Sequence, residues 1–224
     1  GGEANVAVSL ANFGLNAQFV SKLPANPIGQ AAINHLRRYG VGTEHIVQGD
    51  GRIGIYFLEN GASMRASQVV YDRAGACISE VEAEEFDFEE IFKGADWFHF
   101  TGITPALSDS ATRCIEEALK AARRHKVTVS VDLNFRKKLW STQKAQAVMS
   151  NLMQYVDVCI GNEEDAEKVL GFSVEGTDVV AGELNLAGYR KMQRQMMDTY
   201  GVSHVVATLR VSCAASDTRW SALL

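Results

Sequence analysis

Apolar residues recur along the second half of the chain with two different spacings. Short β-branched runs, such as VTVSV at 127–131, are typical of buried parallel strands, and longer stretches have the spacing of amphipathic helices. Because strands and helices alternate, we expect a mostly parallel central sheet with helices on both faces. The expected strands are 97–100, 127–131, 156–160 and 204–208, and the expected helices are 108–125, 142–155, 163–170 and 184–200.

The first part of the chain begins with the same architecture and then changes. A helix is expected within 1–14, a strand at 17–23 and a helix at 27–39. Three short runs with strand character follow at 42–47, 52–59 and 64–71, without helices between them, and they predict an antiparallel meander. We therefore expect an α/β core domain, formed by 1–41 and 73–224, and an inserted β-sheet lid at 42–72. A surface loop is expected at 171–183.

Composition restricts the class of protein. Hydrophobic residues at 46% and charged residues at 22% are typical of a folded globular chain. The net charge of −5 argues against nucleic acid as a partner, and no apolar run approaches the roughly 20 residues of a membrane span. The four cysteines, at 77, 114, 159 and 213, form no CxxC pair, which favours reduced, mostly buried thiols in a cytoplasmic protein. The chain opens on Gly1-Gly2 and stops in the strand-like run WSALL, so we expect an internal segment of a longer protein.

Polar side chains follow three successive strands of the predicted sheet. They are Asp132, Asn134 and Arg136 after 127–131, Asn162, Glu164 and Asp165 after 156–160, and Thr208 and Arg210 at the end of 204–208. Ordinary Asx turns and a helix N-cap at Asn162 explain each cluster separately. Ligands of open α/β sheets bind outside the carboxyl ends of the strands, so the shared placement favours a common cleft. The carboxylates after 156–160 also suit Mg²⁺ beside substrate phosphates.

Two further groups suit a polar ligand. The glycines at the first helix start allow backbone N–H groups and the Asn5 amide to approach a ligand closely, although a simple turn is the alternative. Tyr56, Tyr71 and Arg73 combine aromatic hydroxyls with a guanidinium, which suits a hydroxylated anion. Their alternative is a set of solvent-facing residues on an edge sheet. The glycine start of the chain is not a GxGxxG motif, and no GxxxxGK[ST] phosphate loop occurs in the chain.

The chain resembles the ribokinase-like, PfkB-type carbohydrate kinases, and among them most closely the 2-keto-3-deoxygluconate kinases. The resembling stretches are GGEANVAVSLANFG, GIYFLE, VVYDRAGA, DWFHFTGITPALS, DLNFRKKLW, VDVCIGNEEDAEKVLG and TLRVSCAASDTRWSA. The resemblance implies a three-layer α/β fold with a small β-sheet lid. It also implies an enzyme that transfers the γ-phosphoryl group of MgATP to the 6-hydroxyl of 2-keto-3-deoxygluconate.

The resemblance also implies roles for individual residues. The sugar acid would be bound by Gly2, Asn5, Tyr56, Tyr71, Arg73 and Arg136, and Arg136 would also be catalytic. The nucleotide side would contain Asn162, Thr208 and Arg210. Mg²⁺ would be held by Asp165 and Glu164, mainly through water. Asp165 stands where the family motif Asn-x-x-Glu has glutamate, and Arg210 stands where many relatives have glycine. The family's Gly-Ala-Gly-Asp motif, which supplies the catalytic aspartate, is absent, so we expect these 224 residues alone to be inactive.

The sequence leaves alternatives for the activity and predicts one assembly. A sibling kinase would act on fructose, ribose or another sugar acid, and a non-catalytic sugar-binding protein would keep the same fold. The apolar run at 53–58 would leave an exposed sheet face unless substrate or a second subunit covered it, so we expect a homodimer through the lid sheet.

Overall fold

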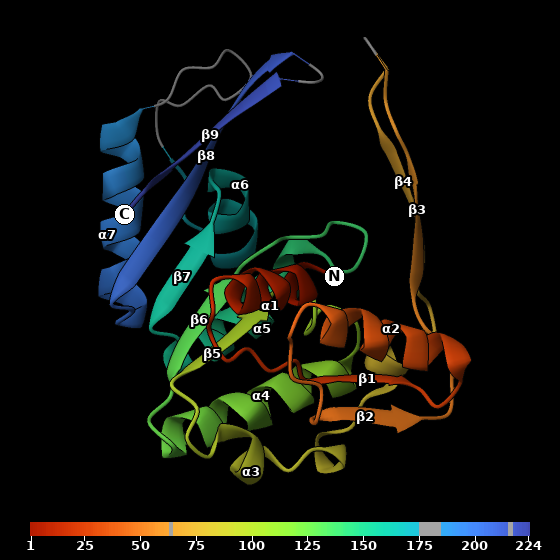
Figure 1. Ribbon diagram of the computed structural model, residues 1–224. Coiled ribbons are helices and arrows are strands. Elements are labelled where there is room, and N and C mark those ends of the chain that lie inside the picture. Colours follow the sequence, from red (N-terminus) through yellow and green to blue (C-terminus); the bar gives the residue numbers. More distant parts are fainter. Residues whose placement is uncertain (63–64, 175–184, 215–216) are drawn as a thin grey trace.

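The computed structural model describes residues 1–62, 65–174, 185–214 and 217–224, and its largest sheet has five strands (Figure 1). Along the sheet they follow the order β5 (Trp97–Thr101), β6 (Thr128–Asp132), β7 (Val158–Gly161), β8 (His204–Ala214) and β9 (Asp217–Leu223). The first four are parallel, and β9 pairs antiparallel with β8. The expected mostly parallel sheet is therefore present.

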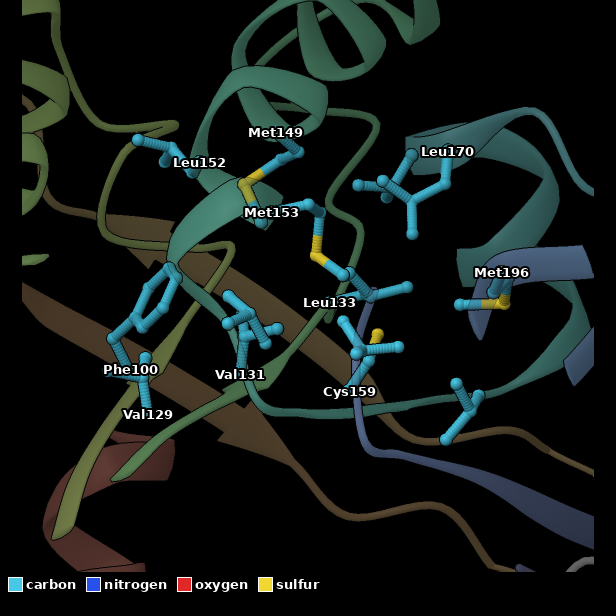
Figure 2. Packing of buried hydrophobic residues seen from close by; sticks show 14 of the residues in the cluster. Phe100, Val129, Val131, Leu133, Met149, Leu152, Met153, Cys159, Leu170 and Met196 are labelled. Carbon is cyan, nitrogen blue, oxygen red and sulfur yellow. The ribbon is translucent and has the colours of Figure 1, made fainter. Parts of the chain in front are cut away.

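Successive side chains of β6 point alternately to the two faces of this sheet. Val129 and Val131 are fully buried in the main core, where they lie with residues of the helices α4 (Asp109–Arg124), α5 (Thr142–Leu152) and α7 (Leu186–Tyr200). Figure 2 shows Val129 and Val131 below Met149, Leu152 and Met153 in this core. On the opposite face, the Ser130 hydroxyl accepts a hydrogen bond from Trp97 Nε1 at 2.7 Å. The helix α1 (Gly2–Asn12) lies over that second face (Figure 1).

Side-chain caps mark where the helices begin. The Ser108 hydroxyl accepts from the Ala111 amide at 3.0 Å and starts α4, and the Ser141 hydroxyl accepts from the Lys144 amide at the start of α5. Each cap satisfies one of the amides that a helix start leaves unpaired. The helix expected at 142–155 leaves α-helical geometry after Leu152 and ends as a 3-10 turn, Met153–Tyr155.

The predicted meander is wrong in its first strand. Strand β2 (Ile46–Gly49) pairs in parallel with β1 (Ser21–Pro24), and the helix α2 (Pro27–Arg38) connects them. A parallel pair needs such a crossover, and the helix provides it. The run at 42–47 therefore belongs to a small β–α–β unit before the hairpin.

The rest of the inserted segment is a two-stranded hairpin. Strand β3 (Ile55–Glu59) pairs antiparallel with β4 (Gln68–Asp72), and the hairpin extends away from the α/β body as a separate arm (Figure 1). Arg52 clamps its base, because both terminal nitrogens of the guanidinium donate to the Asp72 carboxylate at 2.6 Å. The predicted run at 64–71 begins partly outside the described residues. Whether 42–72 is a separate domain stays a prediction.

Short helical segments complete the chain. They are η1 (Cys77–Glu80), η2 (Ala83–Glu85) and α3 (Phe88–Phe92) before β5, and α6 (Glu163–Asp165), which continues as the π-helical turn Ala166–Leu170, after β7. Most of the surface loop predicted at 171–183, and residue 184 of the last predicted helix, lie outside the described residues. Cys77, Cys114 and Cys159 are free and buried as expected, while the side chain of Cys213 lies outside the described part. No helix of the described residues has the length and apolar character needed to cross a bilayer.

Candidate functional site

The turn that follows β6 is held on both sides by neighbouring strands. The Leu133 amide donates to the Ile160 carbonyl at 2.9 Å, and the Gly102 amide donates to the Asp132 carbonyl at 2.9 Å. Gly102 allows this approach, because a Cβ atom there would lie 2.2 Å from the Leu133 carbonyl oxygen. The chain then turns sharply at Asn134, whose φ of 42° lies in the left-handed region. The start of the predicted polar cluster is therefore a rigid strand-end turn.

The turn that follows β7 is joined to it by one carboxylate. Asn162 caps α6, since its Oδ1 accepts from the Asp165 amide at 2.8 Å and its own amide donates to Asp165 Oδ2 at 3.2 Å. This reciprocal pair is a capping box. The other oxygen of Asp165, Oδ1, accepts from the Phe135 amide at 2.8 Å. The predicted clusters at 132–136 and 162–165 are therefore in direct contact.

Charge at this edge of the sheet is only partly balanced. Burial raises the pKa of Asp132 to about 6, and the nearby Asp165 acts in the same direction, while Arg136 opposes both. Burial also raises the pKa of Asp165, against the two backbone hydrogen bonds and Arg136, which lower it. The exposed Arg136 side chain reaches only the Phe135 carbonyl, at 3.1 Å, among the hydrogen bonds of the described residues. A guanidinium beside two carboxylates, with donors still free to face solvent, is suited to an anionic ligand.

Glu3 fastens the start of α1 to the same edge of the sheet. Its Oε1 accepts from the Thr101 hydroxyl at 2.6 Å and from the Thr104 hydroxyl at 3.1 Å. A Cβ atom on Gly2 would lie 4.0 Å from Asn134 Nδ2, so the glycine start of α1 lies beside the turn after β6. No role for Glu3 follows from the sequence pattern. Its partners are 98 and 101 residues away, and no local pattern signals them.

Asn5 is exposed on the first turn of α1, and its backbone amide donates to the Gly1 carbonyl at 3.1 Å. The amide side chain is therefore at the surface near the glycine start, where a ligand can reach it.

The three residues predicted on the inserted sheet lie together on one face of the hairpin. Tyr56 and Tyr71 are directly opposite each other in the register, and their ring centroids are 6.2 Å apart. The Arg73 guanidinium lies over the Tyr71 ring, 4.4 Å from its centroid. A guanidinium stacked on an aromatic ring keeps its N–H edges available for a carboxylate. Tyr56 and Tyr71 belong to the hairpin strands β3 and β4, which extend away from the α/β body (Figure 1).

The predicted end of the fourth strand at 208 is wrong, because β8 continues to Ala214 while it pairs with β9. Thr208 still stands at the carboxyl edge of β7, since Gly161, the last residue of β7, pairs with Ala207. Thr208 is half-buried, and Arg210 is exposed over the Trp220 ring, 5.6 Å from its centroid. The structure thus separates Arg210 from the turn after β6 and pairs it with an aromatic ring of β9.

The described residues offer a metal ion few ligands. No group of three or more His, Cys, Asp or Glu side chains that could hold an ion occurs among them. Asp165 is 8% exposed and both of its oxygens accept backbone N–H groups, whereas Glu164 next to it is exposed. The donor set therefore fits Mg²⁺ that keeps several waters and is bound mainly by phosphates, with Glu164 as the accessible carboxylate.

Comparison with known proteins agrees with this arrangement. A solved structure named as a 2-dehydro-3-deoxygluconokinase from Thermotoga maritima is 53% identical, with a TM-score of 0.94, and the match covers 99% of this chain and 66% of that one. A Haloferax volcanii protein named 2-dehydro-3-deoxygalactonokinase is 37% identical over 170 residues, which is 76% of this chain and 53% of that protein. A Thermoproteus tenax protein named 2-dehydro-3-deoxygluconokinase is 31% identical over 76% of this chain and 52% of that protein.

The chain spans about half the length of the curated relatives it matches. Residues 1–209 match the family model of the pfkB family carbohydrate kinases, so the match extends from the glycine start of α1 into β8. The predicted resemblance and the ribokinase-like α/β fold are thereby confirmed. The chain belongs to the PfkB family of carbohydrate kinases.

Proposed function

We propose that the whole protein transfers the γ-phosphoryl group of MgATP to the 6-hydroxyl of 2-dehydro-3-deoxygluconate, also called 2-keto-3-deoxygluconate. The observation that carries this proposal is the cluster of Arg73, Tyr71 and Tyr56 on one face of the hairpin. The guanidinium can bind a carboxylate while the two phenol groups bind hydroxyls of the same molecule. A neutral sugar has no carboxylate for the guanidinium to bind. The names of the Thermotoga maritima and Thermoproteus tenax relatives support the same substrate.

The remaining residues divide between the two ends of such a substrate. Arg73 binds the carboxylate while the tyrosines hold hydroxyl groups from the arm. Gly2 and Asn5 bind further hydroxyls from the start of α1, which Glu3 fastens to the sheet. Arg136 lies at the strand-end turn, where its charge stabilises the phosphoryl group during transfer.

The nucleotide would occupy the other side of the same edge. Asn162 follows the last residue of β7, and Thr208 lies on β8 at the same edge; both would face the phosphates, and Arg210 lies farther along β8. Mg²⁺ bound with ATP neutralises phosphate charge. Glu164 would hold this ion through water. The resemblance places the catalytic aspartate in a Gly-Ala-Gly-Asp motif that these 224 residues do not contain, so their inactivity alone stays a prediction.

A second substrate is favoured by one specific observation. The relative from Haloferax volcanii is named for the galactonate-derived acid, which differs from the gluconate-derived acid in the configuration at one hydroxyl-bearing carbon. Both acids present the same carboxylate to Arg73. Discrimination between them would therefore come from the hydroxyl-binding groups, Tyr56, Tyr71 and Asn5.

We also infer a cytoplasmic homodimer. The three buried cysteines are unpaired, which suits a reducing compartment. One face of the hairpin exposes Ile55, Phe57 and Val70, with 43%, 61% and 61% of their surfaces accessible. A second copy of the hairpin would cover this apolar face.

Coupled measurement of ATP consumption by the whole protein tests the proposed reaction. The two 2-dehydro-3-deoxy acids, fructose and ribose are compared at equal concentrations. We expect turnover with the acids and little with the neutral sugars. A preference for fructose or ribose would replace the proposed substrate, and no turnover with any of them would favour a non-catalytic sugar-binding protein.

The Arg73→Ala variant tests how the acid is recognised. An arginine–carboxylate hydrogen bond contributes about 1.5–3 kcal/mol, so we expect KM for the acid to rise by about tenfold to a hundredfold. KM for ATP should not change. Arg65→Ala is the matched control, because Arg65 lies on the same hairpin but pairs with Glu59. Equal effects of the two variants on KM for the acid would contradict the assignment.

A further inference from the structure

Asp165 occupies an unusual position for a residue expected to bind a metal ion. Its side chain is 8% exposed, and its two oxygens accept from amides in two different turns. The bond to Asn162 belongs to the capping box at the start of α6. A helix cap does not require the second bond, to an amide 30 residues earlier in the chain. This second bond therefore needs another explanation.

The amide that Asp165 binds belongs to the residue immediately before Arg136. Phe135 follows Asn134, whose φ of 42° lies in the left-handed region, which asparagine adopts more readily than most residues. The Phe135 amide donates to Asp165 Oδ1 at 2.8 Å, and the Phe135 carbonyl accepts from Arg136 Nη1 at 3.1 Å. The Phe135 residue is thus held at its amide by Asp165 and contacts the guanidinium at its carbonyl.

Both attachments begin on rigid elements. The turn leaves β6 after Leu133, whose amide is bonded to the Ile160 carbonyl of β7. Asp165 stands one turn into the helical segment that follows β7. Its carboxylate closes a loop of hydrogen bonds between two adjacent strands at their carboxyl ends. A shift of α6 relative to β6 would therefore move the backbone of Arg136.

We propose that Asp165 is a positioning residue for Arg136, which holds the turn after β6 against the turn after β7, and that it is not a ligand of the magnesium ion. The proposal rests on the proposed phosphoryl transfer, in which Arg136 faces the transferred group. Of the two carboxylates, the exposed Glu164 alone would then contact the magnesium ion, through water. Aspartate is one methylene shorter than the glutamate of the family motif. Its carboxylate therefore stays close to the backbone, where it accepts the hydrogen bond from the Phe135 amide.

The chain contains a matched control at the opposite end of the same two strands. Asp157 precedes β7, and its Oδ2 accepts from the Val129 amide of β6 at 2.8 Å. Its other oxygen, Oδ1, accepts from the Arg123 guanidinium at 3.2 Å. Asp165→Asn and Asp157→Asn each leave one acceptor oxygen where the carboxylate has two, so each weakens a set of contacts that includes a bond to a backbone amide of β6 or of the turn after it. Only the bond made by Asp165 adjoins Arg136.

Steady-state kinetics of the whole protein separate the two roles of Asp165. For Asp165→Asn we expect kcat/KM for the sugar acid to fall by about thirtyfold, with half-saturating Mg²⁺ within about twofold of wild type. Asp157→Asn should leave both quantities unchanged. If half-saturating Mg²⁺ rises about tenfold and excess Mg²⁺ restores kcat, Asp165 is a metal ligand and the proposal is overturned.

A double-mutant cycle tests whether Asp165 acts through Arg136. In an Arg136→Ala background, Asp165→Asn should reduce kcat/KM by no more than about threefold further, because the group that it positions is gone. Additive losses would overturn the proposal. Asp165→Glu provides a second variant if Asp165→Asn does not fold. We expect it to lower kcat/KM with unchanged half-saturating Mg²⁺, whereas tighter Mg²⁺ binding by this variant would count against positioning.

Hydrogen exchange supplies a readout that does not depend on catalysis. The peptide containing Phe135 should exchange about tenfold faster in Asp165→Asn, and the peptide containing Val129 should respond to Asp157→Asn instead. If the wild-type protein phosphorylates no acid, the proposed function fails, while the exchange comparison still tests the contact. Unchanged exchange at Phe135 overturns the positioning role in either case.

Discussion

Two carboxylates at the edge of the sheet, Asp132 and Asp165, differ in how their charge is stabilised. Asp165 accepts hydrogen bonds from two backbone amides, which offset part of its burial. At Asp132, burial and the nearby Asp165 carboxylate outweigh the Arg136 charge and the hydrogen bond from the Asn134 backbone, and the Asn134 side-chain amide approaches Oδ2 only to 3.4 Å. The ionised form of Asp132 is therefore unfavourable in the folded protein, and its pKa rises from 3.8 to about 6.

This pKa shift predicts how stability depends on pH at Asp132. Because the pKa of Asp132 is higher in the folded than in the unfolded protein, protonation of Asp132 favours folding. This contribution to the free energy of unfolding is fully present below pH 3.8 and is lost as pH rises through about 6. Asp132→Asn should therefore stabilise the protein more at about pH 7.5 than at about pH 4.5, by about 1–2 kcal/mol after allowance for solvent screening. Chemical denaturation at the two pH values measures the difference.

Asp109→Asn provides a control of opposite sign. A hydrogen bond from Lys144 lowers the pKa of Asp109, so its charge favours the folded state above its ordinary pKa of 3.8. Loss of that charge should destabilise the protein by nearly the same amount at about pH 4.5 and at about pH 7.5, because both values lie above 3.8. A gain for Asp132→Asn that is equal at both pH values would contradict the burial of an ionised Asp132.

At the scale of elements, the site depends on how closely β5 approaches the end of β6. The contact is between Gly102 and the Leu133 carbonyl, and the space admits no side chain. The approach brings the Thr101 hydroxyl, and through it Glu3 and the start of α1, to the same edge. Two strands and one helix are thus aligned by a single small residue.

Gly102→Ala should disturb both stability and activity. A Cβ atom 2.2 Å from a backbone oxygen forces the strand-end turn to move, so we expect a loss of about 1–3 kcal/mol in the free energy of unfolding and at least about a tenfold fall in kcat/KM. Gly94→Ala is the control, because Gly94 has a φ of 75° but a Cβ atom there would have no neighbour within 4 Å. It should lose stability without losing kcat/KM. A Gly102→Ala protein with wild-type kcat/KM would refute the role of this contact.

The whole molecule consists of an α/β body and a projecting hairpin with two different faces (Figure 1). One face carries Tyr56, Tyr71 and Arg73, and the other carries Ile55, Phe57 and Val70. A sheet of two strands is marginally stable by itself, so a hairpin with apolar side chains on this second face gains from being covered. The proposed assembly uses the second face for the partner and leaves the first for substrate.

Phe57→Lys tests the homodimer. We expect the wild-type protein to have the molar mass of a dimer in light scattering at micromolar concentration, and the variant to have that of a monomer, because a buried lysine charge at the interface is unfavourable. Phe13→Lys is the control, since Phe13 is 81% exposed but lies at the end of α1. A monomeric wild-type protein would rule out the assembly, and dissociation by both variants would move the interface away from the hairpin.

Much of the fold follows from local patterns in the sequence. The β-branched runs, the helical spacing of apolar residues and the cap at Asn162 each depend on residues a few positions apart, so they locate β5, β6, β7 and the helices between them. The same patterns place polar side chains after successive strands. The carboxyl ends of parallel strands meet at one edge, so the sequence also predicts where the candidate site lies.

Tertiary structure alone decided which distant groups meet. The partner of β2 is β1, across a helix, and β8 extends past Thr208 because β9 pairs with it. Glu3 meets Thr101 and Thr104, and Asp165 meets the Phe135 amide, at separations of 30 to 101 residues. Periodicity reports which face of an element is buried but not which element covers it. Local patterns thus predict most of the elements and the edge that carries the site, because they depend on neighbouring residues, whereas long-range packing determines the strand partners and the hydrogen bonds that hold the site residues in place.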